Sequence, residues 1–192
     1  MNIIKLNAID STNSYLLNLS RAVHLEDPTI VITNNQTKGR GQHGTSWQSV
    51  PQQSLLFSVF KRFEDLPSNK IPNITYAVSL GLENAFKKYK IPNITIKWPN
   101  DIMSRSKKMA GILIENQIKQ GNVVSSVIGL GINVNEKKFK SLPQATSMLL
   151  TTGNKFNLNE VLQLVIDEIL IQLTKLDKGD YADLKIKYET SL

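Results

Sequence analysis

The sequence predicts an α+β fold, in which a mixed, largely antiparallel sheet has helices packed on one face. Two long segments, 71–89 and 157–176, repeat apolar residues at helical spacing. A hairpin with arms at 101–104 and 108–118 is followed, after a glycine turn, by another strand at 122–134. Strands that succeed one another through short turns favour antiparallel pairing.

The remaining elements follow from caps, turn residues and apolar alternation. In chain order they are a strand at 2–8, a helix capped by Asp10 or Ser11 that runs to about residue 22, strands at 29–34, 54–61 and 94–97, the hairpin and strand named above, and a last helix at 180–189. The apolar sides of the three longer helices are formed by Tyr15, Leu16, Leu19 and Val23, by Ile74, Val78, Leu82, Ala85 and Phe86, and by Leu158, Val161, Leu162, Val165, Ile169, Leu173 and Leu176. The segment 135–157 is polar and rich in turn residues, which predicts a mobile connection.

Composition narrows the class of protein. The chain has 192 residues, 41% of them hydrophobic, which predicts one domain spanning 1–192. It has no cysteine, which excludes disulfides, thiolate catalysis and thiolate metal sites. No apolar stretch resembles a secretory leader or a membrane span, so we expect a cytoplasmic protein without a membrane partner. The net charge of +7 suits nucleic acid, an acidic protein or a small anion. DNA binding is not expected, because no nucleic-acid motif accompanies the charge.

Residues 39–47, Gly-Arg-Gly-Gln-His-Gly-Thr-Ser-Trp, form a glycine-rich stretch suited to holding an anion. Its glycines let backbone N–H groups face one concavity, and Arg40 adds a permanent planar cation. The stretch fits G-x-G-x-x-G, but a dinucleotide-binding site needs a helix after the last glycine. Polar residues and a strand follow instead, and the Gly-Lys-Ser/Thr of a Walker A loop is missing. A flexible surface loop is the alternative for the glycines alone.

Alternation gives the strand at 122–134 two different faces. Its expected core face carries branched apolar residues, Ile128, Leu130, Ile132 and Val134. The opposite face carries Gly129, Gly131 and Asn133, a flat shelf with one amide at its rim. Glycines on one face weaken a strand, and the usual reason is close approach of a ligand or another backbone. A bulge or a tight helix contact is the alternative.

Further motifs accompany the loop and shelf, in order along the chain: Ser11-Thr12-Asn13, Gln36, Lys97-Trp98-Pro99-Asn100-Asp101 and Lys108-Met109-Ala110-Gly111-Ile112-Leu113-Ile114-Glu115. Together they resemble the biotin protein ligase family (biotin–[acetyl-CoA-carboxylase] ligase) between residues 8 and 140. The resemblance implies a catalytic domain with a class II aminoacyl-tRNA synthetase-like fold. It also implies that biotin is activated with ATP and Mg²⁺ as biotinyl-5′-AMP and passed to a lysine of a biotin carboxyl carrier protein.

The resemblance also implies roles for particular residues. The catalytic residues are Lys108, Arg40 and Asp101, and Asp101 is an orienting or metal-side residue. The biotin-binding residues are Ser11, Thr12, Gln36, Gly39, Arg40, Lys108, Gly111, Gly129 and Gly131. The adenylate-binding residues are Gln42, His43, Gly44, Trp47, Asn100 and Asn133. Two alternatives stay open from the residues themselves: Lys108 as a solvated strand end, and Ser11 as no more than a helix cap.

The chain departs from the family pattern at several places. Gln42 and Thr45 stand where the commonest loop form has arginines, which suggests a weaker hold on the adenylate. No helix-turn-helix domain is expected before Ser11, and the small SH3-like C-terminal barrel of the family is expected to be absent. Two other functions are therefore weighed: a lipoate or octanoate transferase of the same fold, and a biotin-binding protein without efficient turnover.

Overall fold

The structure is a computed structural model that describes residues 1–139 and 142–192. The chain divides into two compact units. Unit 1 comprises residues 1–68 and 112–132, and unit 2 comprises residues 69–111 and 133–192. The single domain expected over 1–192 stays a prediction.

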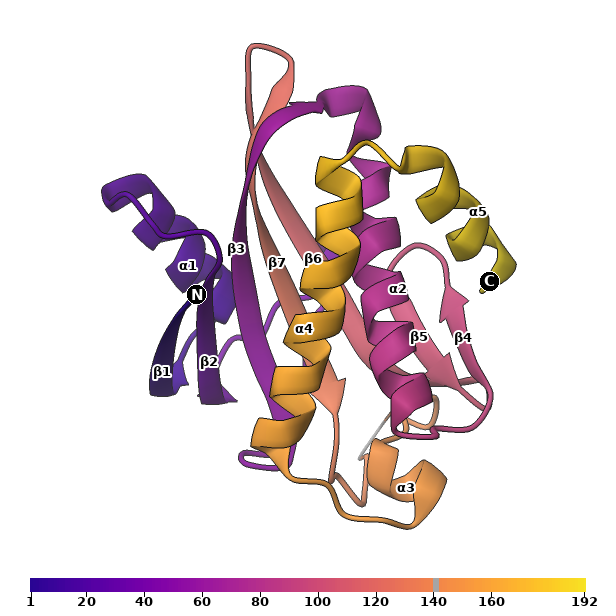
Figure 1. Cartoon of the computed structure of the whole chain (residues 1–192). Coiled ribbons are helices and arrows are strands. Elements are labelled where there is room, and N and C mark those ends of the chain that lie inside the picture. The colour runs from indigo at the N-terminus through magenta and orange to yellow at the C-terminus, as the bar shows by residue number, and fades with distance from the viewer. Residues whose placement is uncertain (140–141) are drawn as a thin grey trace. The chain divides into compact units, whose positions relative to one another are not determined.

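Unit 1 contains one helix and most of the strands (Figure 1). Strand β1 (Asn2–Ile9) pairs in parallel with β2 (Thr29–Gln36), and β2 pairs antiparallel with β3 (Ser54–Pro67). Strand β7 (Asn122–Asn133) and the C-terminal part of β6 (Lys107–Lys119) complete the strand order β1-β2-β3-β7-β6. Helix α1 (Thr12–Ala22) lies against β2 and β3 and buries Leu16 in a cluster with Val31, Phe60 and Val127.

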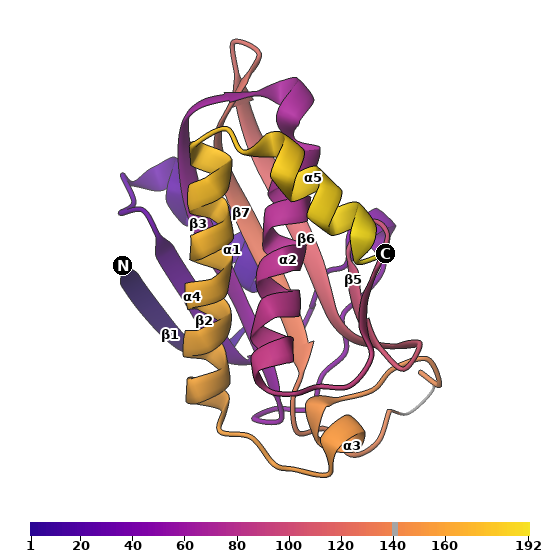
Figure 2. The same cartoon turned by 45° about the vertical axis from the view of Figure 1, so that its right-hand side comes forward.

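Unit 2 is a helical layer with a short antiparallel ribbon. Strand β4 (Ile94–Lys97) pairs with β5 (Asp101–Ser104), and β5 pairs with the first residues of β6. The helices are α2 (Pro72–Lys88), α3 (Met148–Thr152), α4 (Leu158–Asp177) and α5 (Tyr181–Thr190). Figure 2 shows α2, α4 and α5 side by side, in agreement with the extensive packing of α2 on α4. Burial, and secondly Tyr76, raises the pKa of the Tyr188 phenol on α5 to about 12.

The α+β class and the largely antiparallel sheet are confirmed: along the hydrogen-bonded ladder the strands follow the order β1-β2-β3-β7-β6-β5-β4. Every expected helix and strand is present, and most ends agree within two residues. The clearest exception is β3, which runs on to Pro67 because Phe63 and Leu66 are still buried beyond the apolar run. In the described residues, no helix is both long and apolar enough to cross a membrane.

One expectation about packing was wrong. Val23 does not join the apolar side of α1: it is the C-cap, in extended conformation, and is 52% exposed. The mobility expected for the segment 135–157 stays a prediction, but its described part is not irregular throughout. It contains α3, capped by the side chain of Ser147, and it buries Asn135 and Glu136. Residues 140–141 of that segment lie outside the described residues.

Helices α2 and α4 approach so closely that their contact requires a glycine. A Cβ at Gly81 would lie 2.7 Å from the Cα of Ile169 and 2.9 Å from its nitrogen, both backbone atoms that cannot rotate away. Gly81→Ala is therefore expected to lower the free energy of unfolding by about 1–3 kcal/mol, the usual range for overpacking. Alanine has a higher helix propensity than glycine, which offsets this loss by only about 1 kcal/mol. Urea unfolding of the purified variant measures the change.

Ser79, two residues earlier on the same helix, supplies the control. Its hydroxyl is buried without a hydrogen-bond partner among the described residues. Ser79→Ala should leave the free energy of unfolding unchanged or raise it by up to about 1 kcal/mol, because an unsatisfied buried hydroxyl is removed. Equal stabilities for Gly81→Ala and Ser79→Ala would contradict a backbone-limited contact.

Candidate functional site

The site residues expected from the sequence fall into both units. Unit 1 carries Ser11, Thr12, Gln36, Gly39, Arg40, Gln42, His43, Gly44, Trp47, Gly129 and Gly131. Unit 2 carries Asn100, Asp101, Lys108, Gly111 and Asn133.

The glycine-rich loop of unit 1 closes on itself through backbone hydrogen bonds. The Gly41 N–H donates to the Thr45 carbonyl at 2.7 Å, and the Trp47 N–H donates to the Gly39 carbonyl at 2.9 Å. Between these bonds, His43 and Gly44 take left-handed backbone conformations with φ of 51° and 77°. The loop and two residues of β6, Leu113 and Ile114, border a hollow of about 500 Å³. The side chain of Gln42 borders this hollow and forms no hydrogen bond among the described residues.

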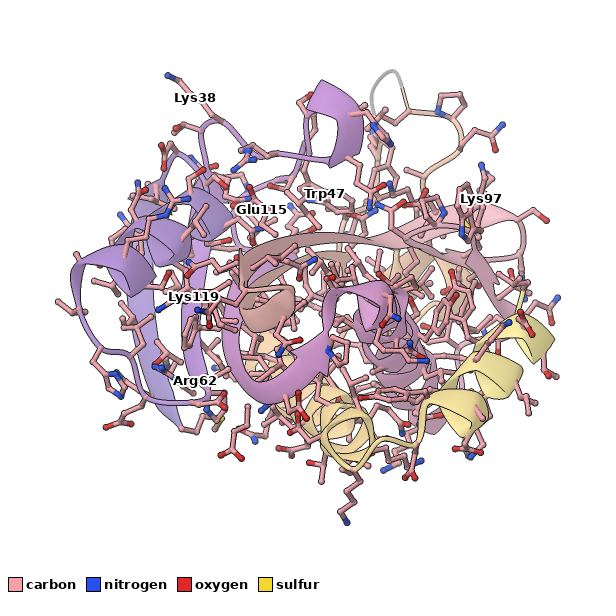
Figure 3. The ribbon with its side chains drawn as sticks, turned by 90° about the horizontal axis from the view of Figure 1, so that it is seen from above. Lys38, Trp47, Arg62, Lys97, Glu115 and Lys119 are labelled. Carbon is pink, nitrogen blue, oxygen red and sulfur yellow. The ribbon has the colours of Figure 1, made fainter. Side chains whose placement is uncertain are left out.

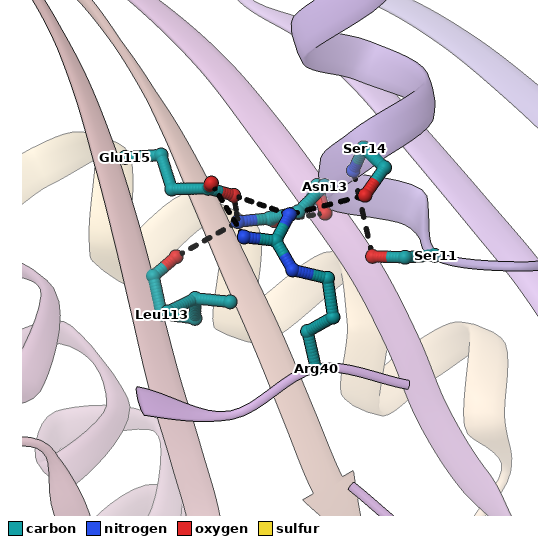
Figure 4. A network of polar contacts seen from close by, with 7 residues as sticks. Ser11, Asn13, Ser14, Arg40, Leu113 and Glu115 are labelled. Atoms are coloured by element: carbon teal, nitrogen blue, oxygen red, sulfur yellow. Dashed lines mark hydrogen bonds and ion pairs between the residues drawn. The ribbon is translucent and has the colours of Figure 1, made fainter. Parts of the chain in front are cut away.

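Arg40 already holds an anion in this structure, and that anion is a side chain of the protein. Its guanidinium donates to both carboxylate oxygens of Glu115 on β6, at 2.8 and 3.2 Å, and to the Ser14 hydroxyl at 3.0 Å (Figure 4). A planar guanidinium matches a carboxylate in this two-point geometry. The Arg40 side chain is 44% exposed, so a second anion can still reach it.

A continuous line of polar contacts runs beneath the start of α1. The Thr12 and Ser58 hydroxyl oxygens lie 2.8 Å apart, and the Ser58 oxygen lies 2.6 Å from Asn13 Oδ1. Asn13 Nδ2 donates to Glu115 at 2.9 Å, which fixes the orientation of the amide. Asn13 Oδ1 can therefore only accept, and the Ser58 hydroxyl donates to it or to the Thr12 hydroxyl, which in turn donates to Gln36 Oε1 at 3.1 Å. Gln36 Oε1 is satisfied by the Thr12 backbone N–H at 2.8 Å.

Ser11 acts as the N-cap of α1. Its side chain accepts from the Ser14 N–H at 3.4 Å, a long bond, while its own N–H donates to Asp10 at 2.6 Å. Ser11 is also buried. The cap is therefore confirmed for Ser11 rather than Asp10, and the cap does not exclude a second contact made by the same hydroxyl.

The glycine shelf is covered by protein side chains. A Cβ at Gly129 would collide with the Asn13 amide of α1, and a Cβ at Gly131 would collide with the indole of Trp47. In Figure 3, Lys38 extends away from unit 1 whereas Trp47 lies against the strands. The expected core face is confirmed, because Ile128, Leu130 and Ile132 are buried. For Gly129, the alternative of a tight helix contact is thus the arrangement found.

In unit 2, Lys108 and Asp101 form an ion pair across β5 and β6, with Nζ and Oδ1 2.7 Å apart. Lys108 is no free strand end, because its backbone N–H donates to Gln144 and its carbonyl accepts from Thr146, at 2.7 and 2.8 Å. Residues 98–100 form the expected turn before β5, and Trp98 there is 73% exposed. The Lys108 ammonium and Asp101 carboxylate are half-buried, where an ion pair is stronger than at the surface.

Asn133, at the end of β7, is held in place by one half of its amide. Its Nδ2 donates to the Thr146 carbonyl at 3.0 Å. Its Oδ1 is buried and has no hydrogen-bond partner among the described residues. A buried acceptor without a donor costs about 1–3 kcal/mol, which a ligand N–H or O–H would recover.

The donor set does not fit a metal held by the protein alone. Nowhere in the part of the chain that the structure describes do three Asp, Glu, His or Cys side chains gather. Asp101 offers a single carboxylate, and Lys108 already neutralises it. A Mg²⁺ ion at Asp101 would need most of its ligands from elsewhere.

Comparison with known proteins decides the family. The model described as the Biotin/lipoate A/B protein ligase family matches residues 6–133. The chain belongs to this family. It is 30% identical to the bifunctional ligase/repressor BirA of Escherichia coli (strain K12) over 186 residues, which is 96% of the chain and 57% of BirA. It is 34% identical to the biotin--[acetyl-CoA-carboxylase] ligase of Mycobacterium tuberculosis over 142 residues, which is 72% of the chain and 52% of that protein.

A solved structure of a biotin/lipoate ligase agrees with the fold of this chain. The biotin protein ligase from Aquifex aeolicus in complex with biotin and ATP superimposes with a TM-score of 0.83 at 28% identity, covering 100% of this chain and 78% of that one. The chain spans about half the length of the relatives from Escherichia coli and Mycobacterium tuberculosis.

Sequence reasoning about this ligase-family chain missed Ser58 and undervalued Glu115. Ser58 lies inside the apolar run at 55–60 and is fully buried, and a polar residue in such a run signals a hydrogen-bonded position. Glu115 ends the quoted Lys108–Glu115 motif but was given no role. Both residues complete the polar line that orients Asn13 and Arg40.

Ser58→Ala is expected to lower the free energy of unfolding by about 1–3 kcal/mol, because it leaves Asn13 Oδ1 buried without its donor. Chemical unfolding of the variant measures this cost. Ser46→Ala is the matched control: Ser46 is exposed, and its loss should change stability by less than about 0.5 kcal/mol. Equal effects of the two substitutions would show that the polar line does not stabilise unit 1.

Proposed function

We propose that the chain is an ATP-dependent biotin protein ligase. The observation that supports this most strongly is the match of the whole chain to a biotin protein ligase described in complex with biotin and ATP. In the first step the biotin carboxylate oxygen attacks the α-phosphorus of ATP, and pyrophosphate leaves with its bonding electron pair. In the second step a lysine amine of a biotin carboxyl carrier protein attacks the acyl carbon, AMP leaves, and the amine loses a proton. We expect this in the cytoplasm, where ATP is available.

The chain would stabilise developing charge and orient the substrates in these steps, since neither step needs a nucleophilic side chain of the enzyme. Lys108 would neutralise the biotin carboxylate and the α-phosphate oxygens, which otherwise repel each other. Asp101, 2.7 Å from the Lys108 ammonium, would hold it in place. Mg²⁺ bound to ATP would screen phosphate charge, with Asp101 as the one carboxylate that this part of the proposed site would offer it.

The proposed binding groups divide by chemistry. Neutral hydrogen-bonding groups suit the ureido ring of biotin: Ser11, Thr12 and Gln36. The fused rings and chain of biotin would lie against glycines: Gly39, Gly111, Gly131 once Trp47 moves away, and Gly129 beside the Asn13 amide that covers it. Loop and turn residues suit the adenylate: Arg40, Gln42, His43, Gly44, Trp47, Asn100 and Asn133. The unpartnered Asn133 Oδ1 would accept a hydrogen bond from the amino group of adenine.

A second candidate function is a lipoate or octanoate transferase, which the name of the matching family includes. A pyrophosphate-release assay with biotin, lipoate and octanoate, each with ATP, separates the candidates. Release with biotin alone supports the proposal, and release with lipoate or octanoate alone supports the alternative. Biotin binding in calorimetry without pyrophosphate release would indicate a binding protein without turnover.

Lys108→Ala should lower the single-turnover rate of adenylate formation by two to three orders of magnitude, because one preorganised charge contact is worth about 2.7–4 kcal/mol of barrier. Rapid-quench measurement of biotinyl-5′-AMP gives this rate. The matched control is Lys107→Ala, which removes the neighbouring exposed lysine. A rate in Lys108→Ala equal to that in Lys107→Ala, with both variants folded, would exclude the role.

Gln42→Arg should slow the dissociation of biotinyl-5′-AMP by roughly fivefold, because a charge-assisted hydrogen bond is about twice as strong as a neutral one. A stopped-flow chase with excess biotin measures the off-rate. Gln48→Arg places the same charge on a nearby exposed residue and should leave the off-rate unchanged. Equal off-rates for Gln42→Arg and the unsubstituted chain would mean that the loop holds the adenylate through its backbone and Arg40.

A further inference from the structure

Unit 2 contains a second hollow, and none of the residues with proposed ligase roles borders it. It has a volume of about 320 Å³ and is formed by α2, α4 and the C-terminal end of α5, which lie side by side in Figure 2. Small-molecule sites begin at about this size. The bordering residues that matter for its chemistry are Glu83, Lys87, Gln172, Lys175, Lys187 and Ser191.

Gln172 is the residue that sets this hollow apart from an ordinary surface groove. It is only 4% exposed, yet its amide forms no hydrogen bond within the described residues. The amide atoms themselves are not fully enclosed, so they can be reached from the hollow. Because Gln172 borders the hollow, a molecule bound there can restore the missing hydrogen bonds.

The charges around Gln172 determine which kind of molecule fits. Lys87 is paired with Glu83 at 2.8 Å, and Ser191 donates to the other Glu83 oxygen at 3.0 Å, so the carboxylate is satisfied from within the protein. Lys187 is paired with Asp183 at 2.7 Å. Lys175 has no ion pair among the described residues. The hollow therefore offers an unpaired ammonium beside a buried amide.

We propose that this hollow binds a small anion that carries at least two phosphate or carboxylate groups. One anionic group would contact Lys175 on α4 and the Gln172 amide, and another would reach Lys187 on α5. Such a molecule would tie α5 to α4 and stabilise unit 2. The net charge of +7 would favour its approach. This site is independent of the proposed ligase chemistry.

The test is thermal unfolding of the whole chain with increasing pyrophosphate or citrate, at an ionic strength held constant with sodium chloride. A ligand that binds only the folded state raises the melting temperature. We expect a rise that depends on concentration and goes with a shift of the Gln172 side-chain amide resonance at the same midpoint. A response to only one of the two anions identifies the group that the hollow prefers.

Substitutions locate the effect. Lys175→Gln should weaken anion binding roughly tenfold, the equivalent of one charge-assisted hydrogen bond. Gln172→Leu should do the same, because it removes the amide that would contact the anion. Lys185→Gln, an exposed lysine of α5 outside the hollow, makes the same charge change as Lys175→Gln and should retain the response.

The proposal is overturned if neither anion raises the melting temperature, or if Lys175→Gln responds as strongly as Lys185→Gln. It is also overturned if the Gln172 resonance does not move. Because Lys175→Gln changes a half-buried side chain at the rim, the test stands even if Gln172→Leu fails to fold.

Discussion

The line of hydrogen bonds from Thr12 through Ser58 and Asn13 to Glu115 is the constraint on which the rest of unit 1 depends. Its members come from α1, β3 and β6, and the contacts between them are 2.6–2.9 Å long. Thr12 and Glu115 have further partners in Gln36 and Arg40, but among the described residues Asn13 Oδ1 accepts only from Ser58, so the loss of Ser58 leaves a buried acceptor without a donor. The start of α1 is therefore held to two strands by polar contacts as well as by apolar packing. The same line of hydrogen bonds requires a glycine at position 129, because any side chain there would occupy the place of the Asn13 amide.

Both cations proposed to act on the substrate are paired with carboxylates of the protein, and the two pairs differ in exposure. The Arg40 side chain is 44% exposed in its pair with Glu115, whereas those of Lys108 and Asp101 are 35% and 20% exposed. An exposed pair contributes only about 0–1 kcal/mol, so a phosphate could replace Glu115 at Arg40 with little loss of stability. The Lys108–Asp101 pair is better shielded, and there an anionic substrate is more readily added beside Lys108 than exchanged for Asp101. Arg40 is thus suited to bind an anion reversibly, and Lys108 is suited to present a positive charge at a fixed position.

The elements of the fold were predictable because their signals are local. The apolar spacing of α4 and the turn residues before β7 lie within single windows of sequence. Ser58 and Glu115 could not be given their partners in that way, since Asn13 lies 45 residues before Ser58 and 102 before Glu115. The five-residue helix α3 is equally inconspicuous: it is set by the Ser147 cap and the left-handed Gly153 rather than by periodicity. The site residues were found as motifs, but the carboxylate that holds Arg40 depends on tertiary structure.

Because Gly131 has no Cβ, there is room above it for the Trp47 indole in this structure and for a ligand in the proposed function. The glycine shelf and the glycine-rich loop therefore meet at this position. If biotin lies on the shelf as proposed, the indole of Trp47 must move away from Gly131. The backbone N–H of Trp47 is bonded to the Gly39 carbonyl at 2.9 Å, so a movement of Trp47 that includes its backbone would shift the glycine-rich loop that carries Arg40. Biotin binding and loop rearrangement would then be one coupled event. The chain has two tryptophans, and Trp98→Phe would leave Trp47 as the only one, whose emission can be excited selectively over that of the five tyrosines. Biotin should change the emission of Trp47. Unchanged emission at saturating biotin would show that biotin binding is not coupled to movement of the loop.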